Sequence, residues 1–457
     1  MREHMNKPDY PDSPTPDSAP LESPPLDGVS FDRVGIVGMG YVGIPLALSF
    51  AAKQTTVLGF DIDPAKVESV NRGESYIKHI PNADIAKYSD GKQLSATANF
   101  DRVQEVDAIL ICVPTPLNKN REPNMTFVKK TAENIGPFLK KGQLVCLEST
   151  TYPGTTRELL VPILEEASGL KAGTDFFVCY SPEREDPANP KFSTTTIPKV
   201  IGGLTSRCAE RGTHLYRKVI AEVVVVTSPE VAEMSKLLEN IFRSVNIALV
   251  NELKVLCHRM GIDIWEVIEA ASTKPFGFMP FYPGPGLGGH CIPIDPFYLT
   301  WKAREYNLST RFIELAGEVN TRIPEFVVDR VAEALNDFGK ALNGARILLL
   351  GVAYKKNVDD MRESPALRIM ELLQKRRAKL EYHDPHVPAL SARASGCGDQ
   401  KSVELDANNV SSYDAVVIVT DHSEIDYQFV CDKAQLVVDT RNVTASLSTD
   451  RSKVYKA

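Results

Sequence analysis

The sequence lacks the features that mark membrane proteins and proteins that bind nucleic acids. No apolar run approaches the roughly 20 residues needed to cross a bilayer. The longer apolar runs, such as residues 347–352 and 415–420, have the length of a strand. We expect no signal peptide at the start of the chain. No long basic stripe interrupts the sequence, and the net charge is -7. We therefore expect neither a membrane nor a nucleic acid as the main partner.

The cysteines also lack a pattern. The chain has 8 cysteines, and none of them forms a CxxC pair. This spacing argues against a zinc cluster and against a disulfide framework, so we expect no metal site. Scattered reduced thiols are typical of a cytoplasmic protein.

Residues 1–30 contain few aliphatic side chains and are rich in Pro, Asp and Ser. Such a segment buries too little apolar surface to offset the entropy of ordering, so we expect a disordered tail. The whole chain of 457 residues, 43% hydrophobic and 24% charged, has the composition of a globular protein. It is long enough for two or three cores.

The first folded unit opens with a strand, a glycine motif and a helix. Residues 34–37 are apolar, residues 44–52 have a helical pattern, and a second apolar run, 57–60, ends in Asp61. This order is typical of a dinucleotide-binding unit, in which glycines let a pyrophosphate approach the helix. Asp61 would bind the adenosine ribose and repel a 2′-phosphate, which favours NAD over NADP. The alternative is a glycine-rich turn that binds nothing. The motif consists of Gly38, Met39, Gly40, Tyr41, Val42 and Gly43.

Two further apolar runs end in hydroxyl side chains. Residues 108–113 stop before Thr115, and residues 144–147 stop before Ser149 and Thr150. Buried parallel strands have this composition, and ligands bind beyond their carboxyl ends. We therefore expect these hydroxyls to lie over the dinucleotide, although turn chemistry alone also accounts for them.

A long helix follows. Ser228, Pro229 and Glu230 form an N-terminal cap, and no proline intervenes before Gly261. About 32 helical residues would span about 48 Å, which indicates a spine that joins domains. Lys236 and Asn240 share one face of it. A solvated face is the ordinary interpretation of such a pair.

Residues 283–296 combine glycines and prolines and cannot form a helix or a central strand. Such a loop lets the backbone approach a ligand, and here it carries Cys291 and, four positions on, Asp295. The alternative is a linker with an incidental thiol.

A second α/β unit begins with the apolar run 346–351. No GxGxxG follows it, so we expect no second dinucleotide. Lys355 and Arg362 nevertheless place cations at the end of this strand, where they suit an anionic or nucleotide group. The apolar runs 380–382, 415–420 and 436–438 complete the unit.

The predicted fold class is therefore α/β, with two Rossmann-like doubly wound domains joined by a long helical spine. We expect an NAD-binding domain over 31–225, a central helical domain over 226–338, and a second Rossmann-like domain over 339–457 that suits an anionic or nucleotide group.

From residue 31 to 441 the sequence resembles the UDP-glucose/GDP-mannose dehydrogenase family. The resemblance implies an NAD-dependent, four-electron oxidation of the C6 alcohol of a nucleotide sugar to a carboxylate. Cys291 would trap the aldehyde as a thiohemiacetal and then form a thioester. The resemblance also suggests a homodimer, or a higher assembly, packed through the spine. The matching stretches are 38–43, 61–67, 113–116, 148–150, 181–183, 236–240, 283–296 and 355–366.

The resemblance implies a role for each matching residue. Lys236 and Asn240 would stabilise the developing oxyanion and contact the substrate, and Asp295 would activate or order water. Thr150 and Glu183 would contact that water and the substrate. The domain over 339–457 would bind the UDP-sugar. Lys355 would bind its nucleotide, with further substrate contacts from Gly288 and Arg441. The implied cofactor contacts are Gly38, Gly40, Tyr41, Val42, Gly43, Asp61, Lys66, Thr115, Ser149, Thr150 and Arg362.

Some residues depart from the pattern of UDP-glucose dehydrogenases. His290 precedes Cys291, and Ile294 precedes Asp295. Upstream of the glycine loop, where those enzymes carry an arginine, this chain has residues 274–278, Lys-Pro-Phe-Gly-Phe. The Ser-Pro-Glu segment is shortened, so Glu185 has no clear counterpart. These features resemble the branch that oxidises UDP-N-acetylhexosamines, above all UDP-N-acetylglucosamine.

Other substrates and functions stay open at this stage. UDP-glucose, UDP-N-acetylgalactosamine and UDP-N-acetylmannosamine are alternative substrates. A two-electron dehydrogenase of hydroxy acids or sugar phosphates would not need Cys291 in a Gly/Pro loop. An inactive nucleotide-sugar-binding protein would not need Cys291, Lys236, Asn240 and Asp295 together.

Overall fold

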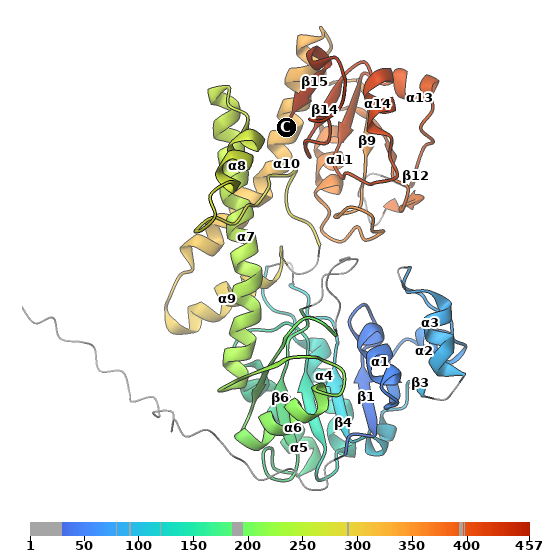
Figure 1. The fold of residues 1–457 in the computed structure, drawn as a ribbon, viewed down its shortest axis with the longest axis vertical. Coiled ribbons are helices and arrows are strands. Elements are labelled where there is room, and N and C mark those ends of the chain that lie inside the picture. The colour runs from blue at the N-terminus through green and yellow to red at the C-terminus, as the bar shows by residue number, and fades with distance from the viewer. Residues whose placement is uncertain are drawn as a thin grey trace, which may run out of the picture.

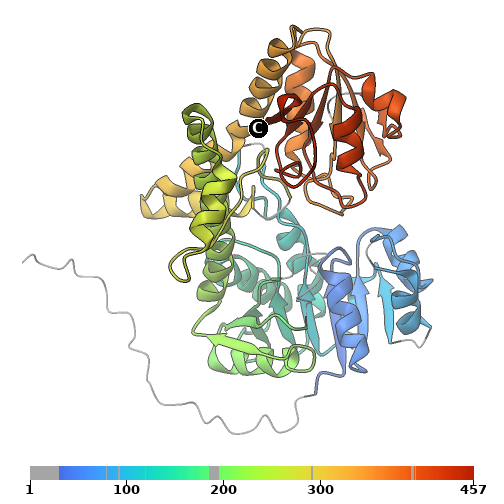
Figure 2. The ribbon, with the colours of Figure 1, turned by 45° about the horizontal axis from the view of Figure 1, so that its top comes forward.

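The computed structural model describes residues 30–78, 80–90, 93–118, 120–184, 195–289, 292–392, 396 and 398–457. Two α/β units lie one above the other on the same side of a long helix (Figure 1). The view turned by 45° shows the same arrangement (Figure 2). The predicted fold class is confirmed, whereas the domain boundaries stay predictions.

The N-terminal unit is a sheet of eight strands in the order β3-β2-β1-β4-β5-β6-β7-β8. All neighbours pair in parallel except β6 and β7, which are antiparallel. Alternate residues of the central strands face opposite cores, with Leu110 on one side and Ile109 and Ile111 on the other. The strands are β1 Arg33–Val37, β2 Thr56–Phe60, β3 Leu94–Thr97, β4 Ala108–Ile111, β5 Leu144–Leu147, β6 Phe177–Tyr180, β7 Lys199–Gly203 and β8 Val223–Val226.

Helices cover both faces of this sheet. One core contains side chains of α1 and α6, such as Phe50 and Tyr216, and the other contains side chains of α4 and α5, such as Val128 and Leu164. Since the strands are covered on both sides, their sequences are almost continuously apolar. The helices are α1 Gly43–Ala52, α2 Pro64–Asn71, α3 Asn82–Ser89, α4 Thr126–Ile135, α5 Val161–Ser168 and α6 Ser206–Tyr216.

The predicted spine is helix α7, Pro229–Met260, with 32 residues. The Ser228 side chain accepts the N–H of Val231, and Gly261 ends the helix with a φ of 69°. Three further helices belong to the central section: α8 Ile264–Ser272, α9 Asp295–Ala303 and α10 Arg311–Asp337. The sequence prediction of this helix and its ends is confirmed.

The C-terminal unit is a five-stranded sheet in the order β10-β9-β13-β14-β15, and all its neighbours pair in parallel. Its strands are β9 Arg346–Leu350, β10 Lys379–His383, β13 Ala415–Ile418, β14 Val437–Asp439 and β15 Val454–Lys456. Its helices are α11 Pro365–Lys375, α13 Ala407–Ser411 and α14 Tyr427–Lys433, and β11 Ala389–Leu390 pairs with β12 Gln400–Lys401. Within the described residues, no helix is both long and apolar enough to cross a membrane.

Several strands were not predicted from the sequence, and β7 shows why. It contains Gly202 and Gly203, which usually weaken a strand. A Cβ atom at Gly202 would lie 2.1 Å from the carbonyl oxygen of Ser228, and one at Gly203 would lie 2.2 Å from the nitrogen of Ala209. Close packing against the starts of α7 and α6 therefore requires both glycines.

Candidate active site

Two side chains of α7 meet the first residue of α9. Lys236 and Asn240 lie one turn apart on the buried side of α7, with exposed fractions of 8% and 6%. Asn240 Nδ2 donates a hydrogen bond to Asp295 Oδ2 at 2.5 Å, and Asp295 is 2% exposed. The interpretation of Lys236 and Asn240 as a solvated face is therefore wrong.

The environment of Asp295 changes its acidity. Burial raises the pKa of Asp295 to about 7, although the charge of Lys236 and the hydrogen bond from Asn240 both act to lower it. A carboxyl group with this pKa is partly protonated at neutral pH. It can therefore accept or give a proton under ordinary conditions.

Helix α9 is bound to the carboxyl ends of two strands of the N-terminal sheet. The buried Tyr298 hydroxyl donates to the carbonyl oxygen of Thr115 at 2.5 Å. The Thr115 hydroxyl in turn donates to the carbonyl oxygen of Thr150 at 2.8 Å. These bonds hold Asp295 beside the ends of β4 and β5. The Ser149 hydroxyl donates to the carbonyl oxygen of Val113 at 2.7 Å. This bond corresponds to the alternative role of the hydroxyl, which is to stabilise a turn.

A second buried charged group lies at the ends of β5 and β6. Lys199 Nζ lies 2.5 Å from Glu148 Oε2 and 4.0 Å from Glu183 Oε2. The Tyr216 hydroxyl donates to the other carboxylate oxygen of Glu148. Burial alone would lower the pKa of Lys199, but pairing with Glu148 and Glu183 raises it. Sequence reasoning missed Lys199, whose only signal is a lysine at the start of an apolar run.

The glycine motif combines tight packing with open space. Gly38 has a φ of 95°, and a Cβ atom there would lie 2.7 Å from the carbonyl oxygen of Cys112. A Cβ atom at Gly43 would lie 2.0 Å from the carbonyl oxygen of Gly38. At Gly40, in contrast, a Cβ atom would meet nothing within 4 Å. Gly38 and Gly43 serve the turn itself, and Gly40 faces space that a ligand can approach.

Asp61 follows β2 and faces this motif. Its Oδ2 accepts the N–H of Met39 at 3.0 Å, and its Oδ1 accepts the N–H of Asp63 at 3.0 Å. Lys66 Nζ lies 3.5 Å from Oδ2. Asp61 is 7% exposed, and each carboxylate oxygen can accept a further hydrogen bond. This corner therefore fits the ribose and pyrophosphate of NAD.

A side chain of the C-terminal unit reaches the same motif. The Arg362 guanidinium carbon lies 5.3 Å from the centroid of the Tyr41 ring. Hydrogen bonds to Asp360 hold the guanidinium in place and raise its pKa. Val42 occupies the N-cap position of α1, so both Tyr41 and Val42 lie where the motif meets the helix.

The glycine loop packs against the segment that carries Lys355. A Cβ atom at Gly288 would lie 2.7 Å from Cβ of Tyr354, and the Gly289 N–H donates to the carbonyl oxygen of Arg362 at 2.9 Å. At the other end of the loop, a Cβ atom at Gly284 would lie 2.8 Å from Nη1 of Arg441. The loop thus contacts two parts of the C-terminal unit, the segment that carries Lys355 and Arg362, and Arg441.

Three residues of the sequence analysis, Cys291, His290 and Glu185, lie outside the described residues. The structure brings Lys236, Asn240 and Asp295 together, and it places Thr115 and Thr150 beside them. It places Gly38, Gly40, Gly43, Asp61 and Lys66 at a separate corner of the same sheet. Within the described ranges, no group of three or more His, Cys, Asp or Glu side chains could hold a metal ion.

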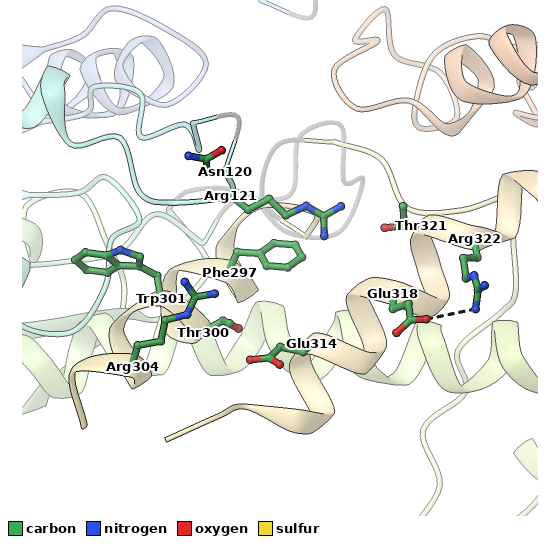
Figure 3. A pocket seen from close by; sticks show the side chains of 10 residues that line it. All are labelled: Asn120, Arg121, Phe297, Thr300, Trp301, Arg304, Glu314, Glu318, Thr321 and Arg322. Atoms are coloured by element: carbon green, nitrogen blue, oxygen red, sulfur yellow. Dashed lines mark hydrogen bonds and ion pairs between the residues drawn. The ribbon is translucent and has the colours of Figure 1, made fainter. Parts of the chain in front are cut away.

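A cavity of about 500 Å³ lies between α9, α10 and the turn that contains Arg121 (Figure 3). The Arg121 guanidinium carbon lies 4.7 Å from the centroid of the Phe297 ring, and Arg322 pairs with Glu318 at 3.3 Å. None of the site residues expected from the sequence lines this cavity. Its lining residues are Asn120, Arg121, Phe297, Thr300, Trp301, Arg304, Glu314, Glu318, Thr321 and Arg322.

Three family models match successive parts of the chain. Residues 32–220 match the NAD-binding domain of the UDP-glucose/GDP-mannose dehydrogenase family. Residues 230–322 match its central domain, and residues 348–446 match its UDP-binding domain.

Individual proteins are similar over most of the chain. UDP-N-acetyl-D-glucosamine 6-dehydrogenase of Pseudomonas aeruginosa is 38% identical over 383 residues, which cover 84% of this chain and 88% of the relative. UDP-N-acetyl-D-mannosamine dehydrogenase of Escherichia coli K12 is 36% identical over 394 residues, covering 84% and 91%. The solved structure of a UDP-glucose dehydrogenase from Pyrobaculum islandicum has a TM-score of 0.83 at 28% identity, covering 94% of this chain and 98% of that one.

The family matches agree with the structure. The glycine motif beside Asp61 fits NAD, and polar residues are buried at the ends of the strands of the same sheet. The chain belongs to the UDP-glucose/GDP-mannose dehydrogenase family, and it is an NAD-dependent nucleotide-sugar dehydrogenase.

Proposed function

We propose that the enzyme oxidises the C6 alcohol of a UDP-N-acetylhexosamine, in the first place UDP-N-acetylglucosamine, to the uronic acid. The observation that carries the chemistry is the buried contact of Asn240 with Asp295 beside Lys236. The choice of sugar is supported by His290 and Ile294 around the thiol and by the similarity to UDP-N-acetyl-D-glucosamine 6-dehydrogenase.

In the proposed reaction, C6 would lose a hydride in each of two successive oxidations, and each hydride would go to a separate NAD, with NADH exchanged for NAD between the two oxidations. The Cys291 thiolate adds to the aldehyde carbon formed first and gives a thiohemiacetal. Oxidation of this adduct leaves a thioester, and water releases the acid and regenerates the thiol. A thiolate serves both steps because it is a good nucleophile and also a fair leaving group.

The buried polar residues would serve the charges and protons of these steps. Lys236 and Asn240 would donate hydrogen bonds to the oxyanion that develops on C6. Asp295, with a pKa near 7, would take a proton from the C6 hydroxyl or from the hydrolytic water. Thr150 and Glu183 would contact that water and the substrate from the ends of β5 and β6.

The remaining proposed contacts divide between the two nucleotides. Gly38, Gly40, Tyr41, Val42 and Gly43 would surround the pyrophosphate of NAD. Asp61 and Lys66 would bind its adenosine end, and Thr115, Ser149, Thr150 and Arg362 would line the rest of the cofactor site. Gly288, Lys355 and Arg441 would hold the UDP part of the substrate.

The proposal is tested by the ratio of NADH formed to sugar consumed, with UDP-N-acetylglucosamine, UDP-N-acetylgalactosamine, UDP-N-acetylmannosamine and UDP-glucose as substrates. We expect two NADH per sugar and the highest kcat/KM with UDP-N-acetylglucosamine. A ratio of one would indicate a two-electron dehydrogenase, and no NADH with any sugar would indicate an inactive binding protein. Cys291→Ala should abolish acid formation and leave NAD binding unchanged.

We further propose that the enzyme acts in the cytoplasm as a homodimer packed through α7. Apolar side chains are exposed along this helix at spacings of three, four and seven residues. A surface of this kind usually packs against another helix. Light scattering that shows an active monomer would contradict the proposal. The exposed side chains are Val231, Met234, Leu238, Phe242, Leu249, Leu256 and Met260.

A further inference from the structure

Lys254 of α7 is a buried cation without an acidic partner. Lys254 is 4% exposed, and its Nζ donates a hydrogen bond to the carbonyl oxygen of Gly284 at 2.9 Å. Among the residues that the structure describes, no carboxylate lies within ion-pair distance of this Nζ. Lysines are rarely buried this far unless a counter-charge accompanies them.

The carbonyl that accepts from Lys254 belongs to a tightly held glycine. The Gly284 N–H donates to Asn251 Oδ1 at 3.0 Å, and Asn251 Nδ2 donates to Asn320 Oδ1 of α10 at 3.0 Å. Asn251 and Lys254 thus hold both polar backbone groups of Gly284. This arrangement fixes the first part of the loop that leads to Cys291.

A second cation reaches the same glycine from the C-terminal unit. A Cβ atom at Gly284 would lie 2.8 Å from Nη1 of Arg441, so this guanidinium lies directly against the glycine. Arg441 follows β14, and its Nε donates to the carbonyl oxygen of Val419 at 2.9 Å. Two positive side chains from different parts of the chain therefore converge on one loop residue.

The surroundings make this pair of cations costly in the absence of an anion. Burial, and next the charge of Arg441, lower the pKa of Lys254 to about 7. Burial also lowers the pKa of Arg441, although Asp421, Asp439 and Tyr427 act to raise it. These acids lie around Arg441, and none of them pairs with Lys254.

The other elements packed near Lys254 add no counter-charge. The ring of Phe326 on α10 lies with its centroid 5.3 Å from Nζ. On α7 itself, His258 lies one turn further and pairs with Glu333 of α10 at 3.9 Å, with Arg330 and Arg259 as its other charged neighbours.

We infer that Lys254 and Arg441 together bind the diphosphate of the nucleotide sugar, and that Lys254 takes up a proton when the diphosphate binds. This inference rests on the proposed function. A diphosphate brings two adjacent negative charges, which matches two adjacent cations, of which Lys254 has no acid partner among the described residues. Gly284 belongs to the same Gly/Pro stretch of the sequence as Cys291 and precedes it by seven positions.

The test is calorimetric binding of UDP-N-acetylglucosamine in the absence of NAD, at pH 8 in two buffers of different ionisation enthalpy. The phosphates of this ligand do not titrate near pH 8, so a proton taken up must bind to the protein. We expect the wild-type enzyme to take up close to one proton at pH 8, about 0.9 for a group with a pKa of about 7. The uptake should vanish at pH 6, where Lys254 is already protonated.

Three variants separate an anion ligand from a structural support. Lys254→Met should weaken binding of the sugar nucleotide about 10- to 100-fold and abolish proton uptake, because a charge-assisted hydrogen bond is lost. Lys254→Arg should bind within about threefold of wild type but without proton uptake, since arginine is always protonated. Asn251→Ala, which removes the other contact to Gly284, should keep the proton uptake.

Lys254→Met should also raise the KM for the sugar nucleotide and leave the KM for NAD unchanged. Wild-type affinity and wild-type proton uptake in Lys254→Met would overturn the inference and leave Lys254 as a support for the loop. Absence of proton uptake in the wild-type enzyme would overturn it even if the variant fails to fold. Neither outcome touches the proposed function, which fails only if no UDP-sugar yields two NADH.

Discussion

The two sheets carry an aspartate at matching positions, Asp61 after β2 and Asp384 after β10. In each sheet this strand is the neighbour of the first strand, β1 or β9. Each aspartate accepts backbone N–H groups from the turn after that first strand. Asp61 accepts from Met39 at 3.0 Å, and Asp384 accepts from Val352 at 2.7 Å and from Ala353 at 3.1 Å.

The aspartates differ in what else they bind. Asp384 also accepts the N–H groups of His386 and Val387, and His422 Nε2 lies 3.1 Å from its Oδ2. Its residue is 2% exposed. Both carboxylate oxygens of Asp384 therefore accept hydrogen bonds from groups of the C-terminal unit itself. Asp61, in contrast, can still accept hydrogen bonds from a ligand.

His422 connects Asp384 to the turn that carries Lys355. Its Nδ1 accepts the N–H of Asn357 at 3.0 Å, so Nε2 bears the hydrogen that faces Asp384. One topology thus serves two purposes, a dinucleotide site in the first unit and a rigid frame for a cationic turn in the second.

Asp384→Asn should produce the largest effect. The amide cannot accept all the hydrogen bonds that the carboxylate accepts, so the free energy of unfolding should fall by about 3 kcal/mol. Urea denaturation at pH 7 measures this loss. Asp61→Asn is the matched control and should lose about 1 kcal/mol or less. Equal losses in both variants would remove the distinction between the two aspartates.

Acid should weaken the C-terminal unit through the same residue. Burial alone would raise the pKa of Asp384, but the hydrogen bonds from His422 and the backbone lower it from 3.8 to about 2. A lowered pKa contributes stability above pH 3.8, about 2 kcal/mol here, and the contribution is lost as the pH falls toward 2. Urea midpoints between pH 5 and pH 2 should show this slope in the wild-type enzyme, and a flatter profile in Asp384→Asn.

Asp61→Asn should act on the cofactor. Loss of a charged acceptor for the ribose should raise the KM for NAD about 10-fold, which corresponds to about 1.4 kcal/mol. The preference for NAD over NADP should also narrow, because the charge that repels a 2′-phosphate is gone. Steady-state kinetics with both cofactors measures the two effects. A variant with unchanged NAD kinetics would show that Asp61, like Asp384, serves only its own turn.

Lys78→Ala should give the smallest effect. Lys78 Nζ donates to the carbonyl oxygen of His386 at 2.9 Å and lies 3.2 Å from Asp359 Oδ2, so it links the N-terminal unit to the C-terminal one. The Lys78 side chain is 62% exposed, and exposed ion pairs contribute about 1 kcal/mol at most. We expect less than a threefold rise in the KM for NAD, and a larger rise would make this contact part of the cofactor site.

The sequence was most informative where structure depends on near neighbours. The glycine motif, Asp61 and the caps of α7 were predicted because turns and helix ends are set by a few consecutive residues. The roles of Lys236 and Asn240 were suggested only by the family resemblance, since helical spacing alone indicates a solvated face. Their burial depends on Asp295, which lies 55 positions from Asn240.

The main features that the sequence analysis did not predict are two buried lysines. Lys199 pairs with Glu148, 51 positions away, and Lys254 contacts Gly284, 30 positions away. Whether a lysine is buried depends on partners that the tertiary fold brings near it, and a local sequence pattern does not identify these partners. The use of Asp384 was hidden for the same reason, since His422 lies 38 positions further along the chain.

The first half of α7 has a mechanical consequence. Ala232, Leu237 and Ile241 pack in the same core as Tyr298 and the strands of the N-terminal sheet. Lys236, Asn240 and Asp295 therefore travel with the sheet that holds the nicotinamide cofactor. If the two halves of the molecule swing apart to exchange substrate, the C-terminal unit would move, while Lys236, Asn240 and Asp295 would stay aligned with the cofactor site of the N-terminal sheet.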